Sequence, residues 1–321
     1  MKRMLLAMGA GAMLAGCVCC NNTTDPVIGN WGAKLPYDDM SAGSLIFSRG
    51  ENGEPKAFVL WRWGSPEWCS DVVIDGNAFS LRHPYGQLFR GTVSGDKMSG
   101  SVAPCDKTGK PTGEFLPFEG WRNPAIEPAN TADAKLGAPI DLLKDGLDGW
   151  KAMGEGHFGW TFEGGVLSNR IKRDAKGKRV GGDANLMTKR ADFFDFALSY
   201  DVRVPKNSNS GVYLRGRYEI QTLDSYGKPV DRHHMAAFYG RITPKVAAEK
   251  KPGEWQHVDV TLYKRHVTVV LNGVTIIDNA PVEGVTGGAI DAEEFVPGPL
   301  YLQGDHSDAD FRNMILRKAV N

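Results

Sequence analysis

Apolar and polar residues alternate over most of the chain, and a period of two residues predicts half-buried β-strands. The clearest run covers residues 194–204, and similar runs recur up to the C-terminus. Asn272 and Gly273 stand between two such runs, which is typical of a two-residue hairpin turn. Residues 245–250, before Pro252 and Gly253, are the one segment in which we expect a short helix. The pattern therefore predicts an all-β fold.

The strand pattern divides the chain into two units. Residues 25–123 carry short runs separated by glycine turns and predict a small antiparallel β domain. Residues 124–139 contain three prolines and no periodicity, which predicts a linker. In residues 140–321 the runs are longer, and their number favours a two-sheet jelly-roll sandwich.

Composition excludes several functions. The 321 residues include 38 Lys+Arg and 38 Asp+Glu, so the formal net charge is zero. Without a basic patch the chain lacks the electrostatic footprint of a nucleic-acid-binding protein. The sequence also contains no phosphate-binding glycine loop, no HExxH and no GxSxG. Nucleotide, zinc-protease and serine-hydrolase chemistry are therefore unsupported.

The N-terminus is typical of an exported protein. Residues 1–16 combine two basic residues with a short apolar run, which predicts a signal peptide. Small residues lead directly into Cys17 and resemble the lipobox of bacterial lipoproteins, so we expect lipidation at Cys17 and a tether over residues 17–24. Cleavage of an ordinary signal peptide near Cys17 is the alternative. We expect a protein of the bacterial cell envelope, on the periplasmic or outer-membrane face, that contacts the membrane only through this anchor.

Cysteine and tryptophan gather in residues 25–123. Cys69 and Cys105 are the only cysteines beyond the tether, and in an oxidising compartment they are expected to form a disulfide. Two free thiols are the alternative. Five of the eight tryptophans also lie here, and we expect them in the core of this unit more than on a sugar-binding surface.

Strand alternation sorts the polar residues of the second unit by face. Asn209, Tyr213 and Arg215 are expected to share one side of a strand, and Glu219 and Gln221 one side of the next. Such a face can bind a sugar and supply a general base, although many polar faces of antiparallel sheets are only solvated. Further candidates lie in neighbouring segments: Asp224, His234, Gln303 and His306.

Several sequence blocks follow one another in a fixed order in the second unit. They are residues 148–150, 160–167, 209–227, 251–256, 271–274, 298–306 and 311–315. Together these blocks resemble the signature of the 3-keto-disaccharide hydrolase family over about residues 140–318. The resemblance implies a concanavalin-like jelly roll that acts on glycosides oxidised at C3 of the sugar, and it does not extend to residues 25–123.

The resemblance also implies roles for the candidate residues. A C3 ketone acidifies the C2 proton, so a base can start elimination of the group at C1, and addition of water completes a net hydrolysis. The catalytic candidates are Glu219, His306, His234 and Asp224. Arg215 or a divalent cation would stabilise the oxyanion, and the cation's candidate ligands are Glu219, Asp224 and His306. The expected substrate-binding residues are Asn209, Tyr213, Arg215, Gln221 and Gln303.

A second function fits the same sandwich. A lectin-like or laminin-G-like module would bind carbohydrate on this face without catalysis, and fold alone does not separate the two functions. Both functions make a carbohydrate the expected partner. The loop carboxylates and histidines favour the enzyme. Ser307 and Asp308 follow His306 where the family often has glycine, which leaves the identity of the substrate open.

Overall fold

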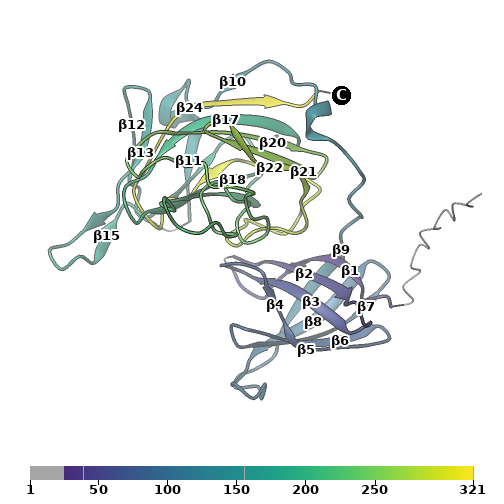
Figure 1. Cartoon of the computed structure of the whole chain (residues 1–321). Coiled ribbons are helices and arrows are strands. Elements are labelled where there is room, and N and C mark those ends of the chain that lie inside the picture. Colours follow the sequence, from purple (N-terminus) through teal and green to yellow (C-terminus); the bar gives the residue numbers. More distant parts are fainter. Residues whose placement is uncertain (1–24, 39, 155, 321) are drawn as a thin grey trace, which may run out of the picture.

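The computed structural model describes residues 25–38, 40–154 and 156–320. The predicted signal peptide, the lipidation of Cys17 and the tether lie outside the described residues. Two β-rich units lie beside each other (Figure 1). The predicted all-β class is confirmed, including the two-sheet sandwich in the second unit. We call residues 25–123 the barrel and residues 140–320 the sandwich.

In the described part of the barrel, nine antiparallel strands form one curled sheet. Their order is β4-β3-β2-β1-β9-β8-β7-β6-β5, and β5 also contacts β3, so the sheet closes around its own core. The strands are β1 (Gly29–Lys34), β2 (Ala42–Arg49), β3 (Pro55–Trp61), β4 (Glu67–Trp68), β5 (Ser70–Asp75), β6 (Ala78–His83), β7 (Gln87–Ser94), β8 (Lys97–Pro104) and β9 (Leu116–Arg122).

Aromatic side chains fill the barrel core. Trp31 and Trp61 are buried there, and the Trp61 ring meets Phe89 edge to face with centroids 5.4 Å apart. Trp63 and Trp68 differ, because 47% and 59% of their surfaces are exposed. The tryptophans of this unit therefore divide between core and surface.

The predicted disulfide between Cys69 and Cys105 is wrong, since both are free thiols in the described part of the chain. Cys69 directly precedes β5 and Cys105 directly follows β8, and β6 and β7 lie between those two strands. Three strand spacings amount to about 14 Å. A disulfide needs Cα atoms within about 7 Å. Burial raises the pKa of the Cys69 thiol to about 12, which keeps it protonated.

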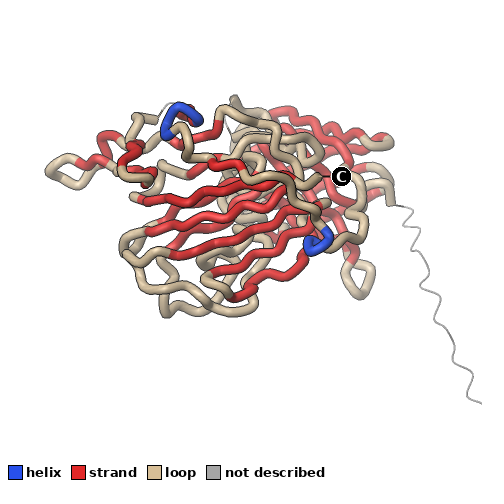
Figure 2. Tube along the Cα trace, turned by 90° about the horizontal axis from the view of Figure 1, so that it is seen from above, coloured by secondary structure: helices blue, strands red, loops and turns tan. Residues whose placement is uncertain are grey.

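The sandwich consists of two sheets, and a side hairpin extends from it (Figures 1 and 2). The eight-stranded sheet has the order β12-β13-β24-β17-β20-β21-β22, with β10 paired to β24. Its strands are β10 (Ile140–Asp141), β12 (Trp160–Glu163), β13 (Val166–Asn169), β17 (Phe196–Arg203), β20 (Gln256–Tyr263), β21 (His266–Leu271), β22 (Val274–Pro281) and β24 (Ala309–Lys318).

The five-stranded sheet, order β11-β16-β23-β18-β19, covers the other side of the core. Two short 3₁₀ helices also flank the sandwich: η1 (Thr131–Asp133) and η2 (Gly146–Gly149). The remaining strands are β11 (Trp150–Met153), β16 (Asn185–Thr188), β18 (Asn209–Leu214), β19 (Tyr218–Leu223) and β23 (Tyr301–Leu302), with β14 (Lys172–Arg173) and β15 (Arg179–Gly181) in the side hairpin.

Local sequence explains the turn between β21 and β22 but not residues 245–250. Asn272 and Gly273 have φ of 51° and 84°, the left-handed values that a type I′ hairpin turn requires. The predicted helix over residues 245–250 is wrong, because the segment is irregular. Its backbone groups bond outside the segment: Ala248 O accepts from Asn272 Nδ2 at 2.8 Å, and Lys250 N–H donates to Gln256 Oε1 at 2.8 Å.

The predicted linker, residues 124–139, lies against the sandwich. Thr131 N–H donates to Asn279 Oδ1 at 2.9 Å, and Asn279 Nδ2 donates back to Ala129 O at 2.9 Å. Near the end of the segment, Gly137 N–H donates to Lys318 O at 2.9 Å. The segment is therefore fixed to the sandwich at several points.

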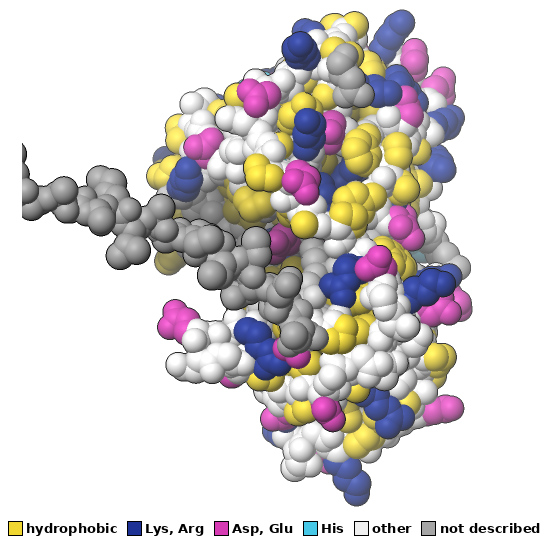
Figure 3. Space-filling view, turned by 90° about the vertical axis from the view of Figure 1, so that its right-hand side faces the viewer, with side chains coloured by type: hydrophobic (Ala, Val, Ile, Leu, Met, Phe, Trp, Pro, Cys, Tyr) yellow, Lys and Arg dark blue, Asp and Glu magenta, His cyan; other side chains and the backbone are white. Residues whose placement is uncertain are grey.

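The surface carries no dominant charge on the face seen in Figure 3, where acidic and basic side chains are interspersed. This agrees with the zero net charge of the sequence. Among the described residues, no helix has the length and hydropathy needed to cross a bilayer.

Candidate active site

One row of side chains crosses the outer face of the five-stranded sheet. Strand register pairs Met187 with Tyr301, Tyr301 with Tyr213, and Tyr213 with Glu219. Directly paired residues share a face. The alternate residues on these strands, such as Val212, face the core. The structure thus places Tyr213 and Glu219 together on the face that the sequence assigned to them.

Glu219 is the chemically unusual member of the row. Its side chain is almost fully buried, its Oε2 accepts from the Tyr213 hydroxyl at 2.8 Å, and its backbone N–H donates to Thr286 Oγ1 at 2.9 Å. Desolvation, reinforced by the charge of Asp305, raises the pKa of Glu219 to about 8 even though Tyr213 opposes the shift. The carboxyl is therefore both buried and basic.

Gly211 makes room for this carboxyl. A Cβ at Gly211 would overlap Glu219 Oε1, so the carboxyl lies directly above the glycine. Gln221 pairs with Gly211 on one side, and Gln303 N–H donates to Gly211 O at 2.9 Å on the other. Any larger residue at this position would displace the carboxyl of Glu219.

Two stacked tyrosines join Glu219 to the loop at residues 287–288. The rings of Tyr213 and Tyr301 lie 3.8 Å apart and nearly parallel, and the Tyr301 hydroxyl donates to Gly288 O at 2.5 Å. The Tyr213 hydroxyl lies 2.9 Å from Gly287 O as well as 2.8 Å from Glu219 Oε2. One phenolic proton serves only one of these acceptors. Donation from Tyr213 to the carboxylate of Glu219 stabilises its charge and opposes the rise of its pKa.

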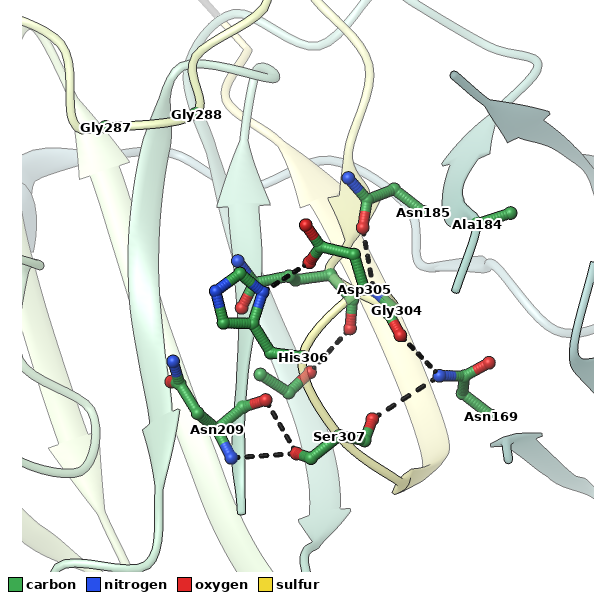
Figure 4. Close-up of polar contacts among 12 residues, drawn as sticks. Asn169, Ala184, Asn185, Asn209, Gly287, Gly288, Gly304, Asp305, His306 and Ser307 are labelled. Carbon is green, nitrogen blue, oxygen red and sulfur yellow. Dashed lines mark hydrogen bonds and ion pairs between the residues drawn. The ribbon is translucent and has the colours of Figure 1, made fainter. Parts of the chain in front are cut away.

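A polar cluster lies at the other end of β18 (Figure 4). His306 Nδ1 is 2.6 Å from Asp305 Oδ1, and Ser307 Oγ bonds both the N–H and the carbonyl of Asn209. The side-chain oxygens of Asn209 and Gln303 are buried without a hydrogen-bond partner among the described residues. Unpaired buried acceptors are costly and rare. These two oxygens are suited to receive the hydroxyl donors of a sugar.

The prediction that Arg215 shares this face is wrong. Strand β18 ends at Leu214, and Arg215 has φ of 54°, a left-handed turn in which strand alternation no longer applies. Its guanidinium donates to the Tyr218 hydroxyl at 2.8 Å, and that hydroxyl donates to Glu294 Oε2 at 2.9 Å. Because Tyr218 belongs to the sandwich core, Arg215 lies on the wrong side of the sheet to stabilise an oxyanion beside Glu219.

Two other candidates also lie away from Glu219. Asp224 follows the end of β19, about 16 Å along an extended strand from Glu219, and accepts from Asn207 N–H at 2.8 Å. This exceeds the separation of the carboxyl pair in ordinary glycosidases. His234 is buried, with Nε2 3.0 Å from Glu249 Oε1. The structure engages both side chains in contacts that support loops.

The expected metal ligands are not brought together. Asp224 accepts from the N–H of Asn207 at 2.8 Å, about 16 Å along an extended strand from Glu219. Within the described ranges, no cluster of three or more His, Cys, Asp or Glu side chains could hold a metal ion.

Sequence reasoning missed Tyr301 and the loop at residues 287–288. Tyr301 lies two residues before Gln303 on the same strand face, so alternation could have identified it. The adjacent Gly287 and Gly288 signal a close backbone approach, but the position of this loop over Tyr213 depends on a contact across 74 residues of chain.

Comparison with known proteins gives one family and several similar structures. The family model described as the 3-keto-alpha-glucoside-1,2-lyase-like domain matches residues 140–317. A candidate glycosyl hydrolase from Parabacteroides distasonis is 25% identical, covers 67% of this chain and 99% of its own, and has a TM-score of 0.44. Another from the same organism is 20% identical, covers 59% and 95%, and has a TM-score of 0.45. None of the curated proteins matches this chain.

Proposed function

The chain belongs to the 3-keto-alpha-glucoside-1,2-lyase-like family and is a glycoside-acting protein. On this premise we propose that it cleaves 3-keto-glycosides, with Glu219 as the base that removes the C2 proton. The observation that carries the proposal is the buried Glu219 carboxyl, whose pKa is raised to about 8. A carboxylate of this basicity suits proton abstraction near neutral pH.

The proposed reaction has two halves. Glu219 takes the proton from C2, and the electrons of the C–H bond pass to the C3 oxygen as an enolate. When the C3 carbonyl re-forms, a double bond forms between C1 and C2, the C1–O bond breaks, and the leaving oxygen takes up a proton. Water then adds across the double bond, with hydroxyl at C1 and hydrogen at C2. The sum is hydrolysis without any change in oxidation state.

The polar cluster suggests how the sugar lies. C1, C2 and C3 are consecutive atoms, so with C2 above Glu219 the C1 and C3 substituents extend in opposite directions along β18. His306, supported by Asp305, is positioned to donate to the C3 oxygen as it becomes negative. The unpaired oxygens of Asn209 and Gln303 accept from sugar hydroxyls at the same end. The leaving group then extends toward the loop at residues 287–288.

The test is aglycone release from a 3-keto-glucoside by the purified protein and by Glu219→Gln. We expect the variant to lose activity by about 10³-fold or more, because a general base typically contributes 10²–10⁴-fold. For the wild type, kcat/KM should rise with pH and level off above about pH 8, as the carboxyl of Glu219 deprotonates. Full activity in Glu219→Gln would overturn the assignment of the base.

The binding function makes a different prediction for the same samples. A non-catalytic module would bind the sugar equally well in the wild type and in Glu219→Gln, and neither protein would release aglycone. A metal-dependent reaction would be abolished by chelator, whereas we expect activity to persist in excess chelator. Calorimetric titration alongside the assay separates these outcomes.

We further propose that the protein is anchored in the bacterial envelope through Cys17, on the sequence argument above. Metabolic labelling with a radioactive fatty acid should mark the wild type and leave Cys17→Ser unlabelled. Equal labelling of both proteins would overturn this location.

A further inference from the structure

A short segment of the barrel contacts the loops that surround Glu219. Residues 62–67 run from the end of β3 to the first residue of β4, and we call them the bridging segment. Although they lie outside the matched family region, two groups of contacts join them to the sandwich. One group involves residues 287–288 and the other residues 232–240.

The first group of contacts involves the loop whose carbonyl oxygens accept from the hydroxyls of the stacked tyrosines. Gly288 N–H donates to Arg62 O at 3.1 Å, and Gly288 O accepts from Tyr301. A Cβ at Gly287 would overlap Gly64 O, so the two backbones are in direct contact. The bridging segment is thus separated from the Glu219 row by a single layer of backbone.

The second group lies beside strand β19. Ser65 Oγ is 2.6 Å from His233 Nε2, and Arg232 pairs with Glu67 at 2.6 Å. The same stretch returns to the site, because Tyr239 N–H donates to Glu219 O at 3.0 Å. The bridging segment therefore contacts both sides of the backbone around Glu219.

Two exposed aromatic side chains lie at this position, one in the bridging segment and one in the turn between β6 and β7. Trp63 and Tyr85 are each 47% exposed, and the Tyr85 hydroxyl lies against Gly64. The Arg62 guanidinium lies 3.6 Å from the Tyr37 centroid and 4.6 Å from the Trp63 ring, which restrains the indole. Arg62 itself has φ of 59°, a conformation that a non-glycine residue keeps only when its surroundings impose it.

We propose that the barrel supplies the leaving-group subsite of the enzyme, with Trp63 and Tyr85 as the aromatic surface on which a second sugar ring stacks. This rests on the proposed function, which directs the C1 substituent toward the loop at residues 287–288. The barrel then favours glycosides whose C1 substituent is a second sugar ring over glycosides with a small aglycone. Rigid aromatic side chains bind such rings with little loss of conformational entropy.

The test compares two 3-keto-glucosides, one with methyl and one with glucosyl at C1. In Trp63→Ala, we expect kcat/KM to fall about 10-fold for the glucosyl substrate through a higher KM, and to change less than about twofold for the methyl substrate. Trp63→Phe should retain most of the glucosyl preference. Tyr226→Ala removes an aromatic side chain of equal exposure beyond the end of β19 and should leave both substrates unaffected.

An equal loss on both substrates would indicate a structural role and overturn the proposal, as would no loss on either. A separate measurement covers failure of the proposed function. If the wild type cleaves neither substrate, calorimetric binding of an unoxidised glucosyl disaccharide still tests the subsite. Weaker binding in Trp63→Ala than in Tyr226→Ala would uphold it, whereas equal binding, or none to the wild type, would overturn it.

Discussion

The barrel and the sandwich are both antiparallel β-structures, but they treat buried polar groups differently. In the barrel core, Trp31 Nε1 donates to Val27 O at 2.9 Å and His83 Nε2 lies 3.2 Å from Val59 O, so side chains bond to nearby backbone. In the sandwich, Glu219 is buried with its charge disfavoured, and Asn209 and Gln303 keep unpaired oxygens among the described residues.

This difference indicates which buried polar groups serve stability and which serve function. A core that satisfies its polar atoms locally is optimised for folding, whereas unpaired acceptors and a desolvated carboxyl cost stability and persist where a ligand uses them. Most buried polar atoms without a partner in the described part of the chain lie in the sandwich. Substitutions in the barrel core should therefore change stability, and substitutions around Glu219 should change activity.

The largest expected effect is on barrel stability. Phe89 is fully buried and meets both Trp61 and Phe118. Phe89→Ala should lower the free energy of unfolding of the barrel by about 3–5 kcal/mol because it leaves a large cavity. Chemical denaturation followed by tryptophan fluorescence measures the loss. A loss of less than about 1 kcal/mol would contradict the view that the barrel core determines stability.

Glu219→Gln, in contrast, should increase the stability of the protein at high pH. Because the pKa of Glu219 is raised from 4.5 to about 8, its stabilising contribution is complete below pH 4.5 and is lost as pH rises through 8. At pH 9 the variant should therefore be more stable than the wild type by about 2–4 kcal/mol. Denaturation midpoints at pH 5 and pH 9 measure this, and a constant difference between the two would contradict the assignment.

Gly211→Ala should affect activity without unfolding the protein. The added methyl group overlaps the position of Glu219 Oε1 and moves the carboxyl from its place over β18. We expect kcat/KM to fall by about 100-fold, equal to about 2.7 kcal/mol of activation free energy. The matched control is Gly273→Ala, which meets open space but has φ of 84° and should reduce only stability.

The smallest effect concerns the thiols of the barrel. Because Cys69 and Cys105 are free, reductant should shift the melting temperature by less than about 1 °C. Loss of a disulfide would lower stability by about 2–5 kcal/mol. A large shift on reduction would show that these thiols are joined after all.

Much of this molecule could be predicted from local sequence. Alternation gave the strands and the shared face of Tyr213 and Glu219, and Asn272 with Gly273 predicted the hairpin. The prediction from alternation failed at Arg215, because β18 ends at Leu214 and Arg215 adopts a left-handed turn. His234 and Asp224 could not be placed, since their loop contacts depend on distant segments.

The contact between barrel and sandwich lay beyond any local pattern. Ser65 meets His233 across 168 residues of chain, and neither residue type signals such a pairing. The thiols illustrate the same limit, because spacing along the chain does not reveal how many strands separate Cys69 from Cys105. Sequence periodicity predicts which residues share a face of a strand, whereas the assembly of a site depends on the distances between segments that are far apart in the chain.

The fixed course of residues 124–139 has a consequence for how the site stays complete. Since the segment is bound along the sandwich through Thr131 and Gly137, it leaves only a short connection between the barrel and the sandwich. A partner tethered by a short connection is present at an effective concentration of about millimolar or more. Direct packing adds to this, because Ala42 and Leu60 of the barrel belong to the sandwich core cluster and Asn123 Nδ2 donates to Glu294 Oε1 at 2.7 Å. A high effective concentration and direct packing therefore act together to keep the site complete.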